Sequence, residues 1–598
     1  MKKRVISIVA IILAVIIAAL SIGITLSKCS GKKVVQVVMV DTDKENTDDD
    51  EDDNTDDADD EDNSGAGDAI NLDLGYTDSS YKQIGEIGDS DDLCNLYVYN
   101  DESGLLVNNY RGLKGSVYHA TEFLDADPND RYYTDEMIDL EFKRYRDAGF
   151  KYMRTQFKSD WMYSGDDSNP WDWESEKMLG FYEFCKKAEE YDIEVLIVLG
   201  WLYSAMMMGG TENDSFLEVP YLMPRELDEN GNPIVVRHWW GIYSEKLDYE
   251  EQNRRYANWG VELIKALERH GVKNANNFIV FNEPKENGGM ITGAYIEYEK
   301  ETFLTLHNAL KDAGLRDKVT LIGPNQNSKS GSAGMAAAFM ADPKYAEIFD
   351  VYSSHSTPSA AASTDDLYDA AYALYTGYMQ KMEDFELINK KEFWLDEFTT
   401  NGDNNLGNND SNEDGWQGTQ ICTTLLAAMN AGISAVSTWQ FIDQTWVGYY
   451  GSGGEYKYGA QILGSMRSLY NSETPFPSYY AVSLFSKFSG EKNGKTYKTE
   501  YSEDHPGVYV GAVQLSDGGW SIFVINMTTD TQEINVNLEK SLGGVTLYRY
   551  KYSPSTVKPT SAAKLITADK GFKNVEKNIV DTLEGGAVAV YSTMEYFG

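Results

Sequence analysis

Eight short apolar runs between residues 111 and 490 constrain the fold more than any other feature of the chain. They are rich in β-branched residues, and they alternate with longer stretches in which apolar residues recur every three or four positions. This alternation is typical of a parallel β-sheet that is covered by helices. The runs expected to form strands are residues 113–119, 152–157, 195–200, 278–281, 319–323, 351–355, 393–397 and 435–441.

Eight strands that are each followed by a helix predict an α/β protein of the (β/α)8, or TIM-barrel, type. A doubly wound open sheet is the alternative, but such a sheet usually has a glycine-rich phosphate-binding turn after its first strand. The chain has Gly112-Leu-Lys-Gly-Ser-Val at that place, which is not such a turn. We therefore expect a barrel over residues 111–490.

The segments on either side of the predicted barrel have a different pattern. Residues 491–598 contain short alternating strands separated by turn signals such as Asp517-Gly-Gly, which predicts a C-terminal β-sandwich. Residues 69–110 are too short and too polar for a domain of their own. We expect them to add a strand or two to the base of the barrel or to the sandwich.

The amino-terminal residues 1–33 are predicted to be a membrane anchor or a signal segment. Residues 5–26 carry no charge and are dominated by Ile, Val, Leu and Ala, which is long enough for a helix that crosses a bilayer. Three basic residues precede this run, so the rest of the chain is expected outside the cell. An uncleaved anchor is favoured. A cleaved signal peptide and a lipid-modified Cys29 are the alternatives.

Charge is concentrated in residues 34–68, which are predicted to be a disordered linker. Positions 41–68 hold 16 Asp or Glu and a single Lys, so this segment repels itself and extends. The whole chain has a net charge of -43, which repels phosphate backbones. Nucleic acid is therefore not an expected partner.

Two carboxylates follow the fourth and the seventh predicted strands. Glu283 lies in the run Val-Phe-Asn-Glu-Pro, and Glu397 lies in Trp-Leu-Asp-Glu-Phe. The strands of such a barrel end at one mouth, where the active site is built. Cleavage of a glycosidic bond needs one carboxylic acid that protonates the leaving oxygen and one carboxylate that attacks the anomeric carbon. The pair predicts this chemistry at the barrel mouth.

The alternation of side chains along a strand predicts where these carboxylates point. We expect Glu397 to point into the barrel together with Phe393 and Leu395, and Asp396 to point outward. By the same argument Glu283 is expected to point inward.

With these residues the chain resembles the retaining β-glycosidases of glycoside hydrolase clan A, the group that includes the family 5 cellulases and mannanases. The resemblance covers about residues 111–490 and implies that Glu283 is the acid/base and Glu397 the nucleophile. It rests on Asn282-Glu283-Pro284 and Glu397, together with three further strand ends, Arg154, His355 and Trp439.

The four further residues are expected to bind substrate. Asn282 is placed to hydrogen-bond a sugar hydroxyl next to the reacting carbon. Arg154 is expected to pair with the nucleophile and keep it ionised, with a purely structural ion pair as the alternative. His355 binds a hydroxyl or tunes the acid, or else is a satisfied residue of the mouth. Trp439 forms the floor on which the sugar stacks, or is a packed core residue.

The sequence therefore predicts an extracellular glycoside hydrolase that acts on β-linked polysaccharide or oligosaccharide with retention of configuration. No metal or organic cofactor is expected, since no His-Glu-x-x-His or similar ligand spacing occurs among only 6 His. We expect a monomer at the cell surface, held in the membrane by its amino-terminal segment, or else a secreted protein or lipoprotein. A non-catalytic carbohydrate-binding protein on the same barrel is the alternative function.

Overall fold

The computed structural model describes most of the chain after residue 92. The described residues are 93–117, 134–162, 171–201, 218–219, 236–237, 249–280, 282, 293–326, 332–356, 367–398, 415–439, 441, 448–450, 456–458 and 474–596. The predicted anchor and the predicted acidic linker lie outside these residues. Within the described part, none of the helices combines the length and the apolar character that a bilayer span requires.

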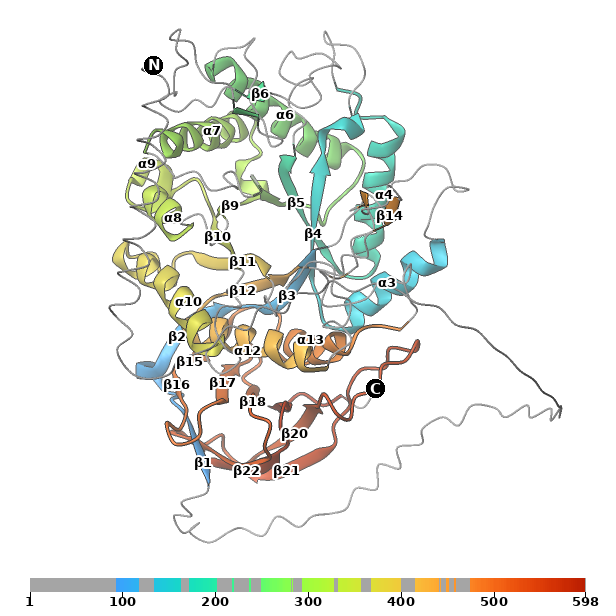
Figure 1. The fold of residues 1–598 in the computed structure, drawn as a ribbon. Coiled ribbons are helices and arrows are strands. Elements are labelled where there is room, and N and C mark those ends of the chain that lie inside the picture. Colours follow the sequence, from blue (N-terminus) through green and yellow to red (C-terminus); the bar gives the residue numbers. More distant parts are fainter. Residues whose placement is uncertain are drawn as a thin grey trace, which may run out of the picture. The chain divides into compact units, whose positions relative to one another are not determined.

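Eight parallel strands close into a barrel, with β3-β4-β5-β8-β9-β10-β11-β12 as the order around the ring (Figure 1). Each of the eight predicted strand runs coincides with one of these strands, and the pairing of β12 with β3 closes the ring. The predicted TIM barrel is confirmed. The strands are β3 (Gly112–Val117), β4 (Tyr152–Lys158), β5 (Glu194–Trp201), β8 (Asn277–Ile279), β9 (Thr320–Gln326), β10 (Val351–Ser356), β11 (Glu392–Phe398) and β12 (Ala435–Thr438).

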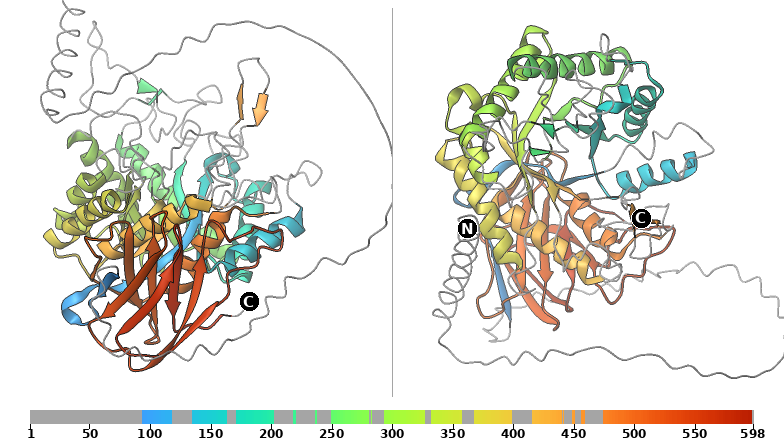
Figure 2. Two further views of the ribbon diagram at one scale, coloured as in Figure 1. Left: turned by 60° about the horizontal axis from the view of Figure 1, so that its bottom comes forward. Right: turned by 45° about the horizontal axis from the view of Figure 1, so that its top comes forward.

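Helices connect successive strands and cover the outside of the barrel (Figure 2). Three of the described α-helices begin at side-chain caps, because Thr134, Ser175 and Asp342 accept hydrogen bonds from the backbone N–H groups of Met137, Met178 and Lys344, respectively. The α-helices are α3 (Asp135–Asp147), α4 (Glu176–Glu190), α6 (Tyr249–Arg269), α7 (Gly293–Asp312), α8 (Ser332–Met340), α9 (Pro343–Ala346), α10 (Leu367–Asp384), α12 (Gly415–Ala431) and α13 (Pro477–Phe488). Short 3-10 helices are η1 (Glu102–Gly104), η2 (Ser159–Met162) and η4 (Arg316–Lys318), and two small hairpins are β6 (Glu218–Val219) with β7 (Val236–Arg237) and β13 (Gly448–Tyr450) with β14 (Tyr456–Tyr458).

The interior of the barrel is filled by one cluster of buried side chains, separate from the larger core between strands and helices. Its members are Tyr152, Leu196, Val198, Ile279, Ile322, Val351, Trp394 and Ala435. On β11, Trp394 belongs to this interior cluster, whereas Phe393 and Leu395 belong to the core outside the barrel. The prediction that Phe393 and Leu395 face inward is therefore wrong.

The carboxyl-terminal part is a β-sandwich, as predicted. A seven-stranded sheet with the order β2-β15-β17-β18-β23-β20-β21 and a four-stranded sheet with the order β16-β1-β19-β22 enclose a second core (Figure 2). The strands of the two sheets are β1 (Cys94–Val98), β2 (Leu105–Tyr110), β15 (Gly494–Tyr497), β16 (Thr499–Glu500), β17 (Val508–Gln514), β18 (Trp520–Asn526), β19 (Gln532–Leu538), β20 (Val545–Tyr552), β21 (Lys570–Val575), β22 (Asn578–Leu583) and β23 (Val588–Ser592).

Two strands that precede the barrel in sequence belong to this sandwich. β1 runs parallel to β19, with Asn95 opposite Asn535, and β2 pairs with β15 in antiparallel fashion. These lead-in strands were expected at the base of the barrel or in the sandwich, and they lie in the sandwich. The sandwich is therefore built from segments that precede and follow the barrel in the sequence.

A buried lysine ties the barrel to α13, the helix that leads into the sandwich. Lys114 is the extra residue of a β-bulge in β3, since Leu113 and Gly115 pair with consecutive residues of β12. Its Nζ donates to the carbonyl oxygens of Gly149, at 3.3 Å, and of Ser486 in α13. Burial lowers the pKa of Lys114 to about 7, because the charged form loses its hydration.

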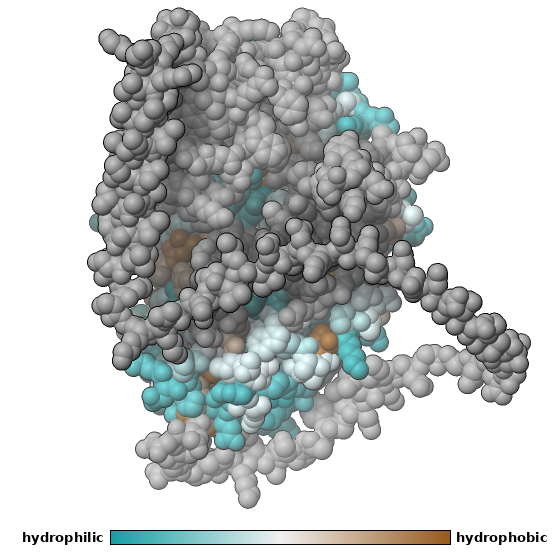
Figure 3. Space-filling view, viewed as in Figure 1, coloured by the Kyte–Doolittle hydropathy of each residue, from teal (hydrophilic) through white to brown (hydrophobic). Residues whose placement is uncertain are grey.

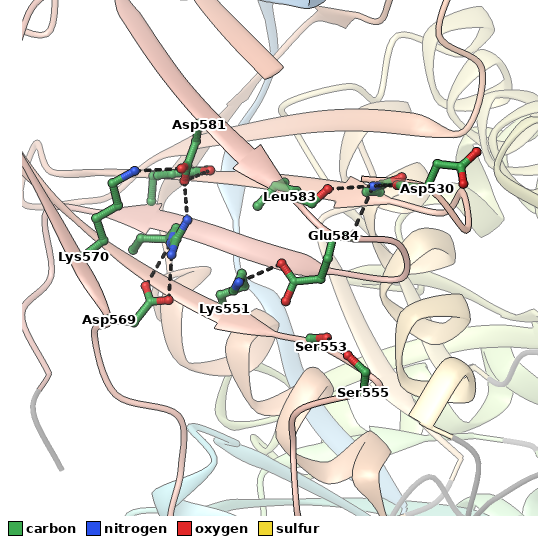
Figure 4. A network of polar contacts seen from close by, with 12 residues as sticks. Asp530, Lys551, Ser553, Ser555, Asp569, Lys570, Asp581, Leu583 and Glu584 are labelled. Carbon is green, nitrogen blue, oxygen red and sulfur yellow. Dashed lines mark hydrogen bonds and ion pairs between the residues drawn. The ribbon is translucent and has the colours of Figure 1, made fainter. Parts of the chain in front are cut away.

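An ion-pair network spans the two sheets of the sandwich (Figure 4). Asp581 of β22 accepts hydrogen bonds from Arg549 of β20 at 2.6 Å, from Lys570 of β21 at 2.8 Å and from the Tyr591 hydroxyl at 2.9 Å. Its side chain is only 3% exposed. Burial on its own raises the pKa of Asp581, but the charges of Arg549 and Lys570 outweigh burial, and the net pKa lies below the usual value.

The surface that the described residues present in Figure 3 is largely hydrophilic. Among these residues, the exposed large hydrophobic side chains are Tyr97, Leu140, Leu179 and Tyr372. They lie on four different elements, β1, α3, α4 and α10. Single apolar side chains of this kind are normal on a protein surface and do not by themselves mark an interface.

Candidate active site

Arg154 is the centre of the candidate site. It lies two residues after Tyr152 on β4 and so points into the barrel, toward the carboxyl ends of the strands. Its side chain is fully buried. A buried guanidinium is stable only with anionic or strongly polar partners, so its surroundings define the site.

Three of the other predicted residues meet at this guanidinium. Nη1 of Arg154 lies 3.0 Å from Oε2 of Glu397, and Nη2 donates a hydrogen bond of 2.5 Å to Oδ1 of Asn282. Nη2 also lies 3.2 Å from Nε2 of His355. The contacts join β4, the segment after β8, β10 and β11, which are far apart in sequence. The structure thus brings together Arg154, Asn282, His355 and Glu397.

The contact with Arg154 also determines which ring nitrogen of His355 carries the proton. A guanidinium can only donate hydrogen bonds, so Nε2 of His355 is the acceptor, and the proton of the neutral ring is on Nδ1. Nδ1 lies 3.6 Å from Oε2 of Glu397. The imidazole therefore directs its N–H group toward the carboxylate that Arg154 already contacts.

Glu397 points into the barrel because of a β-bulge. Ser354 of β10 is opposite Leu395 of β11, but His355 is opposite Glu397, so Asp396 is an extra residue in β11. The extra residue reverses the alternation beyond it. Glu397 therefore shares a face with Trp394, although strict alternation from Trp394 would turn it outward.

Asp396 is buried on the inner side of the barrel, and the prediction that it points outward is wrong. Its side chain is 0% exposed, and its Oδ2 lies 3.6 Å from Nε of Arg154. The same oxygen accepts a hydrogen bond from Nδ2 of Asn325. Asp396 lies two residues after the inward-facing Trp394 and so faces inward by alternation, and the bulge turns Glu397 inward as well, so that two consecutive side chains of β11 reach one guanidinium.

Asn325 is a second bulged residue that the sequence did not reveal. In β9, Pro324 is opposite Ser353 and Gln326 is opposite Ser354, which leaves Asn325 as the extra residue. It has a φ of 61°, in the left-handed region that Asn adopts more readily than most residues. Its Nδ2 also lies 3.4 Å from Oγ of Ser353. The two bulged residues, Asn325 and Asp396, thus meet across the inner face of β10.

Trp439 and Glu283 are the remaining two predicted site residues. Trp439 follows β12 and is half-buried, and its backbone N–H donates to the carbonyl of Phe398 at 2.6 Å. This bond ties it to the end of β11, the strand that carries Glu397. Glu283 lies outside the described residues, but Asn282 directly before it is described and contacts Arg154.

The two adjacent carboxylates near the end of β11, Asp396 and Glu397, differ in their access to the barrel mouth. The side chain of Glu397 is 19% exposed, whereas those of Asp396 and Arg154 are 0% exposed. An exposed carboxylate that is paired with a buried cation can act as a nucleophile or a base, because the pairing favours its ionised form. Within the described part of the chain, no group of three or more His, Cys, Asp or Glu has the arrangement of a metal site.

Comparisons with known proteins agree with the fold. The chain matches no model of a known protein family, and no curated protein matches it in sequence. Solved structures do match. A GH30 endoxylanase from Clostridium papyrosolvens C71 is 15% identical, with 83% of this chain and 99% of that chain covered and a TM-score of 0.51. A GH51 arabinofuranosidase from Xanthomonas axonopodis pv. citri is 13% identical, with 84% and 99% covered and a TM-score of 0.53.

The endo-β1,6-glucanase BT3312 is also similar, at 15% identity, with 84% of this chain and 94% of that chain covered and a TM-score of 0.52. At such low identity these matches establish the architecture. The chain shares with these solved structures a TIM barrel with an attached β domain.

Proposed function

We propose that the protein is a retaining glycoside hydrolase, with Glu397 as the nucleophile and Glu283 as the acid/base. The observation that carries the proposal is the contact of 3.0 Å between a fully buried Arg154 and a partly exposed Glu397 at the mouth of the barrel. A carboxylate that is held ionised, oriented and open to the mouth is what attack on an anomeric carbon requires. The likeness to solved glycoside hydrolases supports the same class of reaction.

The reaction takes place in two displacements. In the first, an oxygen of Glu397 forms a bond to the anomeric carbon, the glycosidic bond breaks, and Glu283 gives its proton to the leaving oxygen. In the second, the Glu283 carboxylate takes a proton from water, and the water oxygen replaces Glu397 at the anomeric carbon. Both carboxyl groups return to their starting states, and the configuration of the sugar is retained.

The neighbours of Glu397 have defined tasks in this scheme. Arg154 keeps the nucleophile ionised before attack and stabilises it again as it departs. Because Oδ1 of Asn282 accepts from Arg154, its Nδ2 is the group that can donate to a sugar hydroxyl beside the reacting carbon. The N–H of His355 steadies Glu397 from a second side. Trp439 offers a rigid ring against which a sugar can pack.

We also propose that the enzyme acts outside the cell, as a monomer anchored by residues 5–26 and extended from the membrane by the acidic linker. The apolar run and the charge pattern support this location. An anchored protein stays with the membrane fraction through carbonate and high-salt washes and keeps its amino-terminal peptide. A protein that is recovered from the medium and begins shortly after residue 26 was secreted by a cleaved signal peptide.

The catalytic proposal is tested with a substrate panel and a trapping reagent. The panel contains xylan, mannan, β-1,4-glucan, β-1,6-glucan and aryl β-glycosides, with aryl α-L-arabinofuranosides as a separate arm. For any substrate that is cleaved, NMR of the first-formed product is expected to show the retained anomer. A 2-fluoro glycoside of the same sugar is expected to label Glu397 in the peptide map.

Two results contradict the proposal. An inverted first product excludes the double displacement, and labelling of a residue other than Glu397 excludes this nucleophile. Saturable binding of an oligosaccharide without turnover of any substrate supports the alternative, a carbohydrate-binding protein.

A further inference from the structure

Asp396, directly before the proposed nucleophile, has a task of its own. We propose that Asp396 is a positioning residue, which holds Arg154 in the orientation that serves Glu397 and which does not itself touch the substrate. This inference rests on the proposed function, because it assigns Asp396 a role in the reaction of Glu397. The two adjacent carboxylates then have different roles: Glu397 attacks the substrate, and Asp396 positions Arg154.

The guanidinium of Arg154 contacts its partners in a defined geometry. Its three nitrogens face three sides: Nη1 faces Glu397 at 3.0 Å, Nη2 faces Asn282 at 2.5 Å, and Nε faces Asp396 at 3.6 Å. A guanidinium is planar, so a partner on the Nε side fixes the direction in which the other two nitrogens point. Asp396 is the anionic partner on that side.

Asp396 and Glu397 differ in burial. Asp396 is 0% exposed, whereas Glu397 is 19% exposed. A substrate at the barrel mouth can therefore reach Glu397 but not Asp396. An unpaired buried carboxylate would be strongly unfavourable, so the position of Asp396 depends on Arg154 as much as that of Arg154 depends on Asp396.

Asp396 is itself held by a dedicated partner. Nδ2 of Asn325 donates to the same oxygen of Asp396 that faces Arg154. Both residues are the extra residues of β-bulges, in β9 and in β11, on either side of β10. Two bulges that bring two polar side chains together at a buried cation are typical of strand ends beside an active site.

The charges around Glu397 predict what Asp396 does to it. Arg154 of β4 and His355 of β10 face Glu397, Asp396 precedes it on β11, and the amides of Asn282 and Asn325 are neutral. The negative charge of Asp396 partly cancels the positive electrostatic potential that Arg154 produces at Glu397, and it repels the ionised form of Glu397. Without that charge, Glu397 should ionise at lower pH and should be a weaker nucleophile.

The test compares three variants of the full chain. In Asp396→Asn the charge is removed and the shape is kept. In the double variant Asn325→Asp, Asp396→Asn the carboxylate is moved to the other end of the same hydrogen bond, at a position where Asp tolerates the left-handed backbone. Glu392→Gln is the matched control, because Glu392 pairs with Arg111 at 2.7 Å at the other end of the same strand.

We expect Asp396→Asn to lower kcat at least tenfold with a smaller change in KM. The acid limb of kcat/KM, which reports ionisation of the nucleophile, should move to lower pH. The double variant should return the acid limb toward its original position. Glu392→Gln should lower thermal stability and leave the pH profile unchanged.

A second readout does not depend on turnover. In carboxyl-¹³C glutamate-labelled protein, the resonance of Glu397 is assigned by its loss in Glu397→Gln, and its titration midpoint should fall in Asp396→Asn. An unchanged midpoint and an unchanged pH profile would overturn the positioning role, and so would labelling of Asp396 by the 2-fluoro glycoside. If the wild type cleaves no glycoside but the midpoint still falls, the proposed function fails while the coupling of Asp396 to Glu397 stands.

Discussion

Nη1 of Arg154 lies 3.0 Å from Oε2 of Glu397, although the two residues come from β4 and β11, which are not neighbours in the barrel. The guanidinium uses its other nitrogens for Asn282 and Asp396 at the same time. One side chain thus joins residues from several strands, and its fork shape matters as well as its charge.

Arg154→Lys is therefore expected to be a severe change. Lysine keeps the positive charge but offers a single nitrogen, which cannot reach Glu397, Asn282 and Asp396 together. We expect kcat/KM to fall by about two to three orders of magnitude, as for loss of a preorganised electrostatic contact. Circular dichroism and the unfolding midpoint serve as controls. A variant with near wild-type kcat/KM would show that the charge alone is sufficient.

A small anion should restore the turnover that is lost when the nucleophile is removed. Glu397→Gly is expected to abolish turnover of an aryl β-glycoside, because no group can attack the anomeric carbon. Azide can occupy the vacated space and should restore the reaction, with a glycosyl azide of inverted configuration as the product. The product is identified by NMR. Asp396→Gly with azide is the comparison, and rescue of that variant in place of Glu397→Gly would reassign the nucleophile.

Removal of the acid/base should depend on the leaving group. Glu283→Ala is expected to slow natural oligosaccharides far more than aryl glycosides whose leaving group needs no proton. The measurement is kcat/KM across a series of aryl glycosides of graded leaving-group pKa. An equal loss for all substrates would indicate a structural role for Glu283.

The ion-pair network of the sandwich predicts a pH-dependent stability. Because the folded-state pKa of Asp581 is depressed, its contribution is fully present above the unfolded-state value of about 3.9 and is lost as the pH falls through the folded-state pKa. Asp581→Asn should destabilise the protein by about 3 kcal/mol at pH 7, because it breaks a buried pair. The difference from wild type should shrink toward pH 3 in denaturant titrations.

The control for Asp581 is its neighbour Asp569, which also pairs with Arg549 but has a side chain that is 40% exposed. Solvent screens this pair, so Asp569→Asn should cost less than about 1 kcal/mol. Equal losses for the two variants would contradict the role of burial.

The buried lysine of β3 predicts a slope of the same sign at higher pH, because its folded-state pKa is also depressed. Burial lowers the folded-state pKa of Lys114 to about 7, while the unfolded-state value is about 10.4. Between these values the unfolded chain binds more protons, so the wild type gains stability from this group as the pH rises. Lys114→Met removes that gain.

Relative to wild type, Lys114→Met should therefore be most favourable at pH 7 or below, and its relative stability should decline toward pH 10. Urea unfolding at several pH values measures the difference. Lys143→Met, at an exposed lysine of α3, controls for the loss of one positive charge. A pH-independent difference for Lys114→Met would show that the buried amine does not titrate in this range.

The strands of the barrel could be predicted because they are encoded locally. Runs such as residues 195–200 are apolar and β-branched, and β5 (Glu194–Trp201) extends the predicted run by only one residue at each end. The final strand was predicted too long, since β12 ends at Thr438, where the apolar pattern continues into the loop. Phe441 packs against Tyr145 and Phe150 in the core between strands and helices, and in sequence it resembles a strand residue.

The direction of the site residues could not be predicted in the same way. Strict alternation gave the correct inward direction for Glu397, but for the wrong reason. Trp394 faces inward, so alternation from it would turn Glu397 outward, and the bulge at Asp396 turns Glu397 inward again. A bulge depends on pairing between strands and leaves no reliable pattern in one strand. The adjacent acids Asp396 and Glu397 and the Pro324-Asn325 pair inside a strand were the only local signs.

The parallel pairing of β1 with β19 has a consequence for synthesis of the protein. Asn95 and its partner Asn535 are 440 positions apart, so β1 leaves the ribosome long before β19 exists. At ordinary elongation rates of about 5–20 residues per second, the wait lasts about 20 to 90 s. During that time the strand edge of β1 and its apolar face, Cys94, Leu96 and Val98, lack the sheet that later covers them. A helper that binds extended apolar segments, such as a chaperone, would therefore meet this chain at its amino-terminal strands while the barrel is still being made.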